Sequence, residues 1–175
     1  MEDFILIRPS EEYAAEIVSY RNDFLASGDS MGGCGDLRTL ADPLRYIEVS
    51  RQLEDPLTVP KNRVQATQFL YVRTSDKRVV GMIQVRHYFN AYLEKFGGHI
   101  GYSVRPSERR KGYATAMLAA VLPYCKEIGL DRVLLTCDDG NVASERTILA
   151  NGGVYESTVF EAGENVGVKR FWIDL

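Results

Sequence analysis

The stretch Val104-Arg-Pro-Ser-Glu-Arg-Arg-Lys-Gly-Tyr-Ala-Thr115 joins a strand-like segment, His99–Val104, to a helical pattern that ends near Gly129. Backbone N–H groups at a helix start lack intrahelical partners, and the helix dipole adds partial positive charge there. Such a helix start binds phosphate when a ligand can approach the backbone closely. Gly112 and Ala114 carry almost no side chain and allow that approach. The stretch therefore predicts a site for a phosphorylated ligand at a strand end.

The turn is basic, whereas the chain as a whole is slightly acidic. The chain has 175 residues and a formal net charge of −3, which fits a single domain over residues 1–175 with a sizeable core. The acidic balance argues against general nucleic-acid binding, which usually shows a basic domain. The turn nevertheless holds four cations within seven positions, namely Arg105, Arg109, Arg110 and Lys111.

Targeting, redox and metal signals point to a reduced cytoplasmic protein. No apolar run approaches the roughly 18 residues that span a bilayer, and the start Met1-Glu2-Asp3 lacks the basic residues of a signal peptide. Cys34, Cys125 and Cys137 form neither a disulfide framework nor a metal-binding pattern. Two histidines are too few for a His-based metal site. We expect no metal, no membrane segment and no nucleic-acid partner.

The segments around the turn predict a strand–helix–strand unit. The helix from Gly112 to Ile128 has one apolar face, and Pro123 inside it predicts a kink near Ala119 or an early end. Arg132–Cys137 contains an unbroken apolar run typical of a strand buried on both faces. A right-handed crossover through this helix would make the strands at 99–104 and 132–137 parallel.

The segments before the turn alternate between regular elements and connections. A first strand at Phe4–Arg8 precedes a helix that ends at Gly28, and Asp42-Pro43 opens a second helix that Asp55-Pro56 stops. Thr67–Arg73 and Val79–Tyr88 form an expected antiparallel hairpin. The glycine-rich segment Gly28–Asp36 is either a surface loop or a loop that lines a substrate site, and Phe89–Gly98 is an aromatic connection.

The segments after the unit complete the fold class. A short helix follows from Asn141 to Ala150, and strands at Val154–Phe160 and Val168–Ile173 form a closing hairpin. The order β α α β β β α β α β β predicts an α/β (α+β) fold. We expect a mixed, mostly antiparallel twisted sheet with one splayed parallel strand pair and about four helices.

Two common phosphate motifs are absent from the turn. It lacks the Gly-x-x-x-x-Gly-Lys-Ser/Thr of a P-loop and the first two glycines of a dinucleotide fingerprint. A basic helix start with Gly112 as an ordinary turn residue is the plain alternative. However, the pattern Val104-x-Pro106-x-x-Arg109-x-x-Gly112-x-Ala114-Thr115-x-x-Leu118 closely resembles the acetyl-CoA-binding motif of the GNAT superfamily of N-acetyltransferases. Asn141-x-x-Ser144, Gly152 and Tyr155 resemble the family's later segment, and the element order is similar over essentially the full length.

This resemblance implies donor-binding roles, and its best local match is to uncharacterised predicted bacterial acetyltransferases. Backbone amides of Arg110, Lys111, Gly112, Tyr113, Ala114 and Thr115 would hold the CoA pyrophosphate. Ser103 and Val104 would pair through their backbone with the pantetheine arm, between strands that splay past Val104 and Cys137. Asn141 and Ser144 would contact pantetheine or the far side of CoA, and Arg105 or Lys111 the 3′-phosphate. The side chains of Arg109 and Arg110 are equally well explained as solvated charges.

The residues for proton transfer depart from the family pattern. The position that holds a general-acid Tyr in many members is Ile148 here, and the position of a Glu base in some members is Gly98. Tyr155 is a candidate general acid; alternatively, it is an aromatic residue that packs in the core or across the strands. His99 is a candidate base with a structural histidine as the alternative, and His87 is similar. Water-mediated transfer is an equal option, and Cys137 is read as a small buried hydrophobe rather than a nucleophile.

The resemblance to this family implies that the acceptor is a primary amine of a small molecule or a protein. It also allows the protein to form a homodimer. We expect an acceptor pocket built from the Gly28–Leu37 loop, the second helix and the Phe89–Gly98 connection. Two other functions remain open: a GNAT-like module that binds acyl-CoA with weak or no catalysis, and a protein-interaction domain without CoA. The candidate polar groups of the pocket are Asp29, Asp36, Glu48, Arg86, His87 and Glu94.

Overall fold

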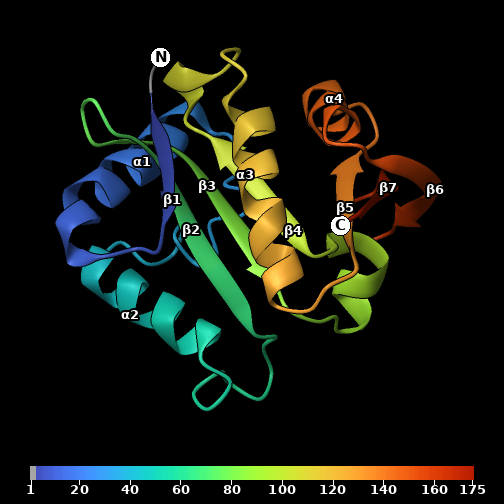
Figure 1. Cartoon of the computed structure of the whole chain (residues 1–175), viewed down its shortest axis with the longest axis horizontal. Helices are drawn as coiled ribbons and strands as arrows, with labels where there is room; N and C mark the ends of the chain where they lie inside the picture. The colour runs from blue at the N-terminus through green and yellow to red at the C-terminus, as the bar shows by residue number, and fades with distance from the viewer. Residues whose placement is uncertain (1–2) are drawn as a thin grey trace.

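The computed structural model describes residues 3–175 (Figure 1). Its strands and helices follow the order predicted from the sequence. Shorter helical turns lie at Glu11–Tyr13, Leu93–Gly97 and Pro106–Glu108. The main elements are β1 (Phe4–Ile7), α1 (Ala14–Ser27), α2 (Pro43–Glu54), β2 (Ala66–Arg73), β3 (Arg78–Arg86), β4 (Ile100–Val104), α3 (Tyr113–Glu127), β5 (Arg132–Asp138), α4 (Val142–Ala150), β6 (Val154–Glu161) and β7 (Val166–Asp174).

The strands form two antiparallel sheets rather than one continuous sheet. The first has the order β1-β2-β3-β4, and the second has the order β5-β7-β6. The predicted hairpins β2–β3 and β6–β7 are confirmed as antiparallel pairs. The fold class is thus confirmed as a mixed α/β arrangement whose strand pairs in residues 3–175 are all antiparallel.

The expected parallel ladder between β4 and β5 does not form in the part of the chain that the structure describes. One backbone bond joins the two segments, from the N–H of His99 to the carbonyl oxygen of Leu134 at 2.8 Å. Beyond it the ends of both strands line a groove instead of pairing. The splay therefore begins at His99, earlier than the predicted point past Val104 and Cys137.

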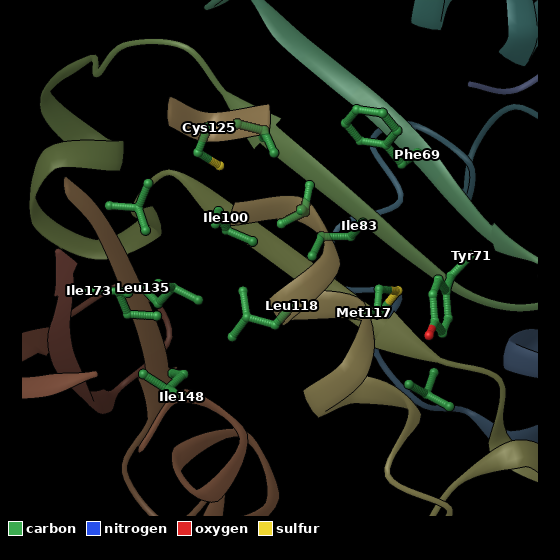
Figure 2. Packing of buried hydrophobic residues seen from close by; sticks show 14 of the residues in the cluster. Phe69, Tyr71, Ile83, Ile100, Met117, Leu118, Cys125, Leu135, Ile148 and Ile173 are labelled. Carbon is green, nitrogen blue, oxygen red and sulfur yellow. The ribbon is translucent and has the colours of Figure 1, made fainter. Parts of the chain in front are cut away.

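Helices cover both faces of the first sheet (Figure 1). On one face, α1 and α2 contribute Tyr20, Phe24 and Ile47 to a core with residues of β2 and β3. On the other face, α3 packs against both sheets and closes the angle between them. Figure 2 shows Leu118 of α3 among Ile83, Ile100 and Leu135, three side chains that come from the two sheets.

Pro123 does not end α3 early, because the helix runs from Tyr113 to Glu127. A proline removes the N–H that would bond the carbonyl four residues earlier, which here belongs to Ala119. Ala119 is exposed to solvent, where water can satisfy that carbonyl. Leu118, Val121 and Cys125 are fully buried and hold the helix on the core around the proline. Among the helices of residues 3–175, none combines the length and apolarity that a bilayer crossing requires.

Candidate functional site

The turn after β4 is anchored by Arg105, which points into the protein. Arg105 is 0% exposed, and its guanidinium lies 3.0 Å from Glu16 and 2.8 Å from Asp23, both on α1. Its Nε donates to the carbonyl oxygen of Val79 at 2.9 Å. The expectation that Arg105 meets a phosphate is therefore wrong: two carboxylates distant in sequence pair with it and bury it.

The start of α3 presents its backbone to solvent. Arg110 (φ 62°) and Gly112 (φ 81°) adopt left-handed conformations that turn the chain sharply into the helix. The first bond of the helix runs from the N–H of Ala116 to the carbonyl oxygen of Gly112 at 3.1 Å. Within residues 3–175 the backbone N–H groups of Arg110, Lys111, Gly112, Ala114 and Thr115 have no acceptor. These groups form the cradle expected for an anion.

The basic side chains of the turn are mostly committed to ion pairs. Arg109 contacts Asp29 at 2.6 Å and also donates to the carbonyl oxygen of Val104 at 3.2 Å. This pair lowers the pKa of the Asp29 carboxyl. Lys111 pairs with Glu108 at 2.7 Å. Arg110 has no carboxylate partner in the described part of the chain, so its side chain is the turn's available cation.

The free edge of β4 faces the second sheet. Arg86 donates its backbone N–H to the carbonyl of His99, and Arg105 donates its own to the carbonyl of Val80. Bonding groups alternate along an antiparallel strand, so the N–H groups of Tyr102 and Val104 point away from β3. The backbone of Ser103 points toward β3, and its hydroxyl lies 3.0 Å from the Tyr20 hydroxyl.

A groove of about 820 Å³ runs along this edge to the start of α3. We call it the strand-end groove. Its other wall is the end of β5 with the first turn of α4. Of the predicted donor-binding residues, the structure brings together Ser103, Val104, Arg109, Arg110, Gly112, Tyr113, Ala114, Thr115, Asn141 and Ser144 as lining residues, whereas Lys111 is not among them.

Tyr102 spans the groove, a contact that our reading of the sequence did not assign. Its hydroxyl lies 2.8 Å from the hydroxyl of Ser144, and Asn141 caps α4 by accepting the N–H of Ser144 at 3.2 Å. Burial raises the pKa of Tyr102 to about 12. The phenol is therefore protonated at neutral pH. The sequence signal for it is strand alternation, which places the side chain of residue 102 on the same face of the sheet as that of Val104.

His99 is held as a structural group. It is 6% exposed and is not among the lining residues of the groove. Its Nδ1 accepts the backbone N–H of Leu134 at 2.9 Å, and its ring packs on Phe89. Burial lowers its pKa to about 4, so the imidazole is neutral and its Nδ1 is already engaged. This placement fits a structural role for His99 better than a role as the general base.

Two other candidates also lie outside the groove lining. Tyr155, the candidate acid, is 52% exposed, its hydroxyl lies 2.8 Å from that of Thr158, and its ring packs on Phe171. The ring of His87 lies 2.8 Å from the hydroxyl of Thr67. These contacts fit a cross-strand packing role for Tyr155 and a structural role for His87.

The two positions where family members carry an acid or a base hold Ile148 and Gly98 here, and both are fixed by packing. Ile148 is fully buried in the main core. Gly98 has φ +67°, and a Cβ there would lie 2.5 Å from the carbonyl oxygen of Leu134. The backbone therefore leaves no room for a side chain at position 98, and the isoleucine at position 148 has no proton to give. Cys137 lines the groove, but burial raises the pKa of its thiol to about 11, which leaves it protonated and weakly nucleophilic.

A second hollow of about 420 Å³ lies beside the groove. This loop pocket is lined by the Gly28–Asp36 segment, the end of α2 and the Phe89–Gly98 connection, as predicted for an acceptor site, and also by residues 62–66, which were not predicted. Of the candidate polar groups, Asp36 and Arg86 line the pocket and Asp29 lines the groove; Glu48, His87 and Glu94 line neither. Within residues 3–175, no cluster of three or more His, Cys, Asp or Glu could hold a metal ion.

The two hollows have three lining residues in common, Gly32, Gly33 and Arg86, which form a shared wall. A Cβ on Gly32 would lie 2.8 Å from the carbonyl oxygen of Tyr102, so only glycine lets the loop lie this close to β4. Gln68 holds the loop by donating to the carbonyl of Gly33 at 2.8 Å. The loop therefore belongs to the site and is not only a surface connection.

Comparison with known proteins supports the fold and the motif. The chain is 30% identical over 84 residues to the uncharacterised N-acetyltransferase YnaD of Bacillus subtilis, and the alignment spans 47% of each protein. It thus spans about half the length of this curated relative. Among solved structures, microcin C7 self-immunity acetyltransferase MccE, in complex with acetyl-CoA and AMP, has a TM-score of 0.73 at 18% identity over 100% of this chain and 94% of its own. The ribosomal-protein-S5-alanine acetyltransferase of Vibrio fischeri has a TM-score of 0.73 at 17% identity, covering 99% and 94%.

The family model is the broadest of these sequence matches. The model of the acetyltransferase (GNAT) family matches residues 37–152. That range contains the lining of both hollows except for the Gly28–Asp36 segment, which precedes it, and it includes the cradle, the splayed strand ends and α4. It covers well over half of the sequence, and the solved structures agree with it in fold. The chain belongs to the acetyltransferase (GNAT) family.

Proposed function

We propose that this protein transfers an acetyl group from acetyl-CoA to a primary amine. The observation that carries this proposal is the meeting of two hollows at Gly32, Gly33 and Arg86. The strand-end groove runs from this meeting point to an anion cradle, and the loop pocket opens on the other side. A donor with a long arm and an acceptor can therefore react at the shared wall.

The groove offers the donor a backbone lining. The N–H groups of Arg110 to Thr115 supply a pyrophosphate cradle, and Arg110 is the turn cation available for a further phosphate. The edge groups of Tyr102 and Val104 pair with the pantetheine arm as an added strand would. Ser103, expected from the sequence to share this pairing, contributes through its neighbours because its own backbone faces β3.

The reaction is direct attack of a neutral amine on the acetyl carbonyl. A carbon–nitrogen bond forms, the carbon–sulfur bond breaks, and the amine loses one proton to water. A backbone N–H of the β4 edge donates to the developing oxyanion. The phenol of Tyr102, which is protonated at neutral pH, gives its proton to the departing thiolate and regains one from water.

Gly98 and Ile148 favour this water-assisted route over the family's usual acid and base, since neither can carry a proton. The same two positions are the reason to test a second function, an acyl-CoA-binding module without efficient catalysis. Free thiol release from acetyl-CoA is followed with a panel of primary amines. Release above background with any amine supports the enzyme. Tight CoA binding without turnover across the panel supports the binding module instead.

A further inference from the structure

Arg86 is a cation without a counter-charge at the junction of the two hollows. It is the last residue of β3 and is partly buried. In the part of the chain that the structure describes, its side chain makes one hydrogen bond, from Nη1 to the carbonyl oxygen of Gly97 at 3.4 Å, a long contact. Among residues 3–175, no carboxylate forms an ion pair with it. Burial lowers its pKa to about 10, so it stays charged at neutral pH.

Three other arginines of this region are paired, whereas the exposed Arg110 at the start of α3 has no carboxylate partner among residues 3–175. Arg105 has two carboxylate partners, Arg109 pairs with Asp29, and Arg63 in the loop pocket pairs with Asp36 at 3.1 Å. A buried charge without a partner costs stability. The fold thus supplies carboxylates to the neighbours of Arg86 and leaves Arg86 itself open to a charge from outside the chain.

We propose that Arg86 binds an anionic group of the acceptor, so that the acceptor is a primary amine carrying a carboxylate or a phosphate a few bonds from its nitrogen. This inference rests on the proposed acetyl transfer. A guanidinium binds either oxyacid group through paired N–H donors. Because Arg86 lines both hollows, an anion on it leaves the neighbouring amine at the end of the strand-end groove.

The loop pocket supplies room for the remainder of such an acceptor. Its walls include the apolar side chains of Leu53, Val64 and Leu93, together with the polar pair of Asp36 and Arg63. Its volume of about 420 Å³ falls within the range of small-molecule sites. An amine with an acidic group and an apolar side chain, as in an amino acid, matches both the charge and the lining.

A matched set of acceptors tests the inference. L-phenylalanine, L-phenylalaninamide and phenethylamine share one side chain and differ in the carboxylate, and O-phosphoethanolamine is compared with ethanolamine to separate phosphate from carboxylate. We expect wild-type kcat/KM to favour the anionic member of at least one pair by about tenfold or more. Arg86→Gln lowers kcat/KM for the anionic members more than for the neutral members and so removes that preference. An equal loss for charged and neutral amines would show an effect on the reaction itself and overturn the inference.

The control and the second variant address folding. Arg45→Gln removes an exposed arginine that pairs only with Glu48 on α2, and it should keep the wild-type preference. Because Arg86 has no carboxylate partner in the described part of the chain, Arg86→Gln should unfold at the same temperature as wild type or a higher one. Arg86→Lys keeps the charge and should retain part of the preference. A folded Arg86→Gln protein with unchanged selectivity would refute the proposal.

A binding measurement separates this inference from the proposed function. N-acetyl-L-phenylalanine carries the carboxylate but no free amine, and it is titrated into the CoA-loaded protein while the thermal midpoint is followed. We expect stabilisation of wild type and none of Arg86→Gln. Stabilisation without any thiol release would retain the anion site and reject the transferase. Thiol release with neutral amines alone, and no stabilisation, would retain the transferase and reject the anion site.

Discussion

The strand-end groove is built mainly from backbone, whereas the loop pocket is built mainly from side chains. The groove takes its donors from the edge of β4 and the start of α3, which are consecutive in the sequence. The loop pocket takes its lining from five separate segments between residues 31 and 93. A groove that binds through backbone groups suits a donor that is the same in every relative. A pocket lined by side chains from several segments allows the acceptor to change while the sheet stays the same.

The largest expected effect tests how the two regions are joined. Arg105 directly follows β4, whose last residues line the groove, and it pairs with Glu16 and Asp23 on α1, which packs on the other face of the first sheet from α3. Arg105→Gln leaves both carboxylates without their cation and should lower the free energy of unfolding by about 3–5 kcal/mol. Urea denaturation measures it, with Arg110→Gln as an unpaired, exposed control on the same turn. A loss below about 1 kcal/mol would mean that the regions are not coupled through this residue.

The next prediction tests the backbone cradle. Ala114→Glu places a carboxylate in the first turn of α3, where the proposed pyrophosphate would lie. Like charges at close range cost several kcal/mol, so we expect CoA affinity to fall by more than about 100-fold. Isothermal titration with CoA measures it. Ala120→Glu, on an exposed position of the same helix, should leave affinity close to wild type. Equal affinity in both variants would place the donor elsewhere.

Arg105 and Arg109 show how much the sequence could predict. The turn, the helix after it and the order of the elements follow from contiguous patterns, and the structure confirms them. The partners of Arg105 lie more than 80 residues away in the chain, so no local pattern distinguishes it from Arg109. The split into two sheets was missed for a similar reason, because β5 pairs with β7, whose position depends on the whole second sheet.

Arg86 shows a different limit. The sequence indicated it as one candidate polar residue of an acceptor pocket, and in the structure it lines the loop pocket. Its proposed role could not be predicted because it depends on the lack of a carboxylate near its guanidinium in the described part of the chain. That lack can be recognised only when the positions of all neighbouring segments are known. Gly98 is similar: its need for glycine comes from the carbonyl of Leu134, a residue of another sheet.

A third prediction tests whether a side chain contributes to the groove's chemistry. Tyr102→Phe removes the hydroxyl next to Ser144 but keeps the ring. We expect kcat to fall by roughly 10-fold to 100-fold, because the thiolate must then take its proton from water, while CoA affinity stays unchanged. Steady-state kinetics with the best amine of the panel measures the loss. Ser144→Ala should have a smaller effect, and an unchanged kcat in Tyr102→Phe would leave the groove with backbone functions alone.

The smallest expected effect concerns His99, where the two sheets meet beside Arg86. Burial, with a contribution from the charge of Arg86, lowers the pKa of His99 to about 4, against about 6.5 in the unfolded chain. The unfolded state therefore binds the proton more readily, and stability falls as the pH drops from about 6.5 toward 4. The loss attributable to His99 should reach about 1 kcal/mol by pH 5.5.

Urea denaturation at pH 7.5 and pH 5.5 measures this loss in wild type and in His99→Gln, which has no imidazole to titrate. The variant starts less stable, since it disturbs the bond from the N–H of Leu134, so the comparison uses the difference between the two pH values. Arg86→Gln should shrink that difference in an otherwise wild-type chain, because it removes the nearby positive charge that disfavours the imidazolium. An identical pH dependence in wild type and His99→Gln would mean that His99 is not held neutral, and its assignment as a structural group would then fall.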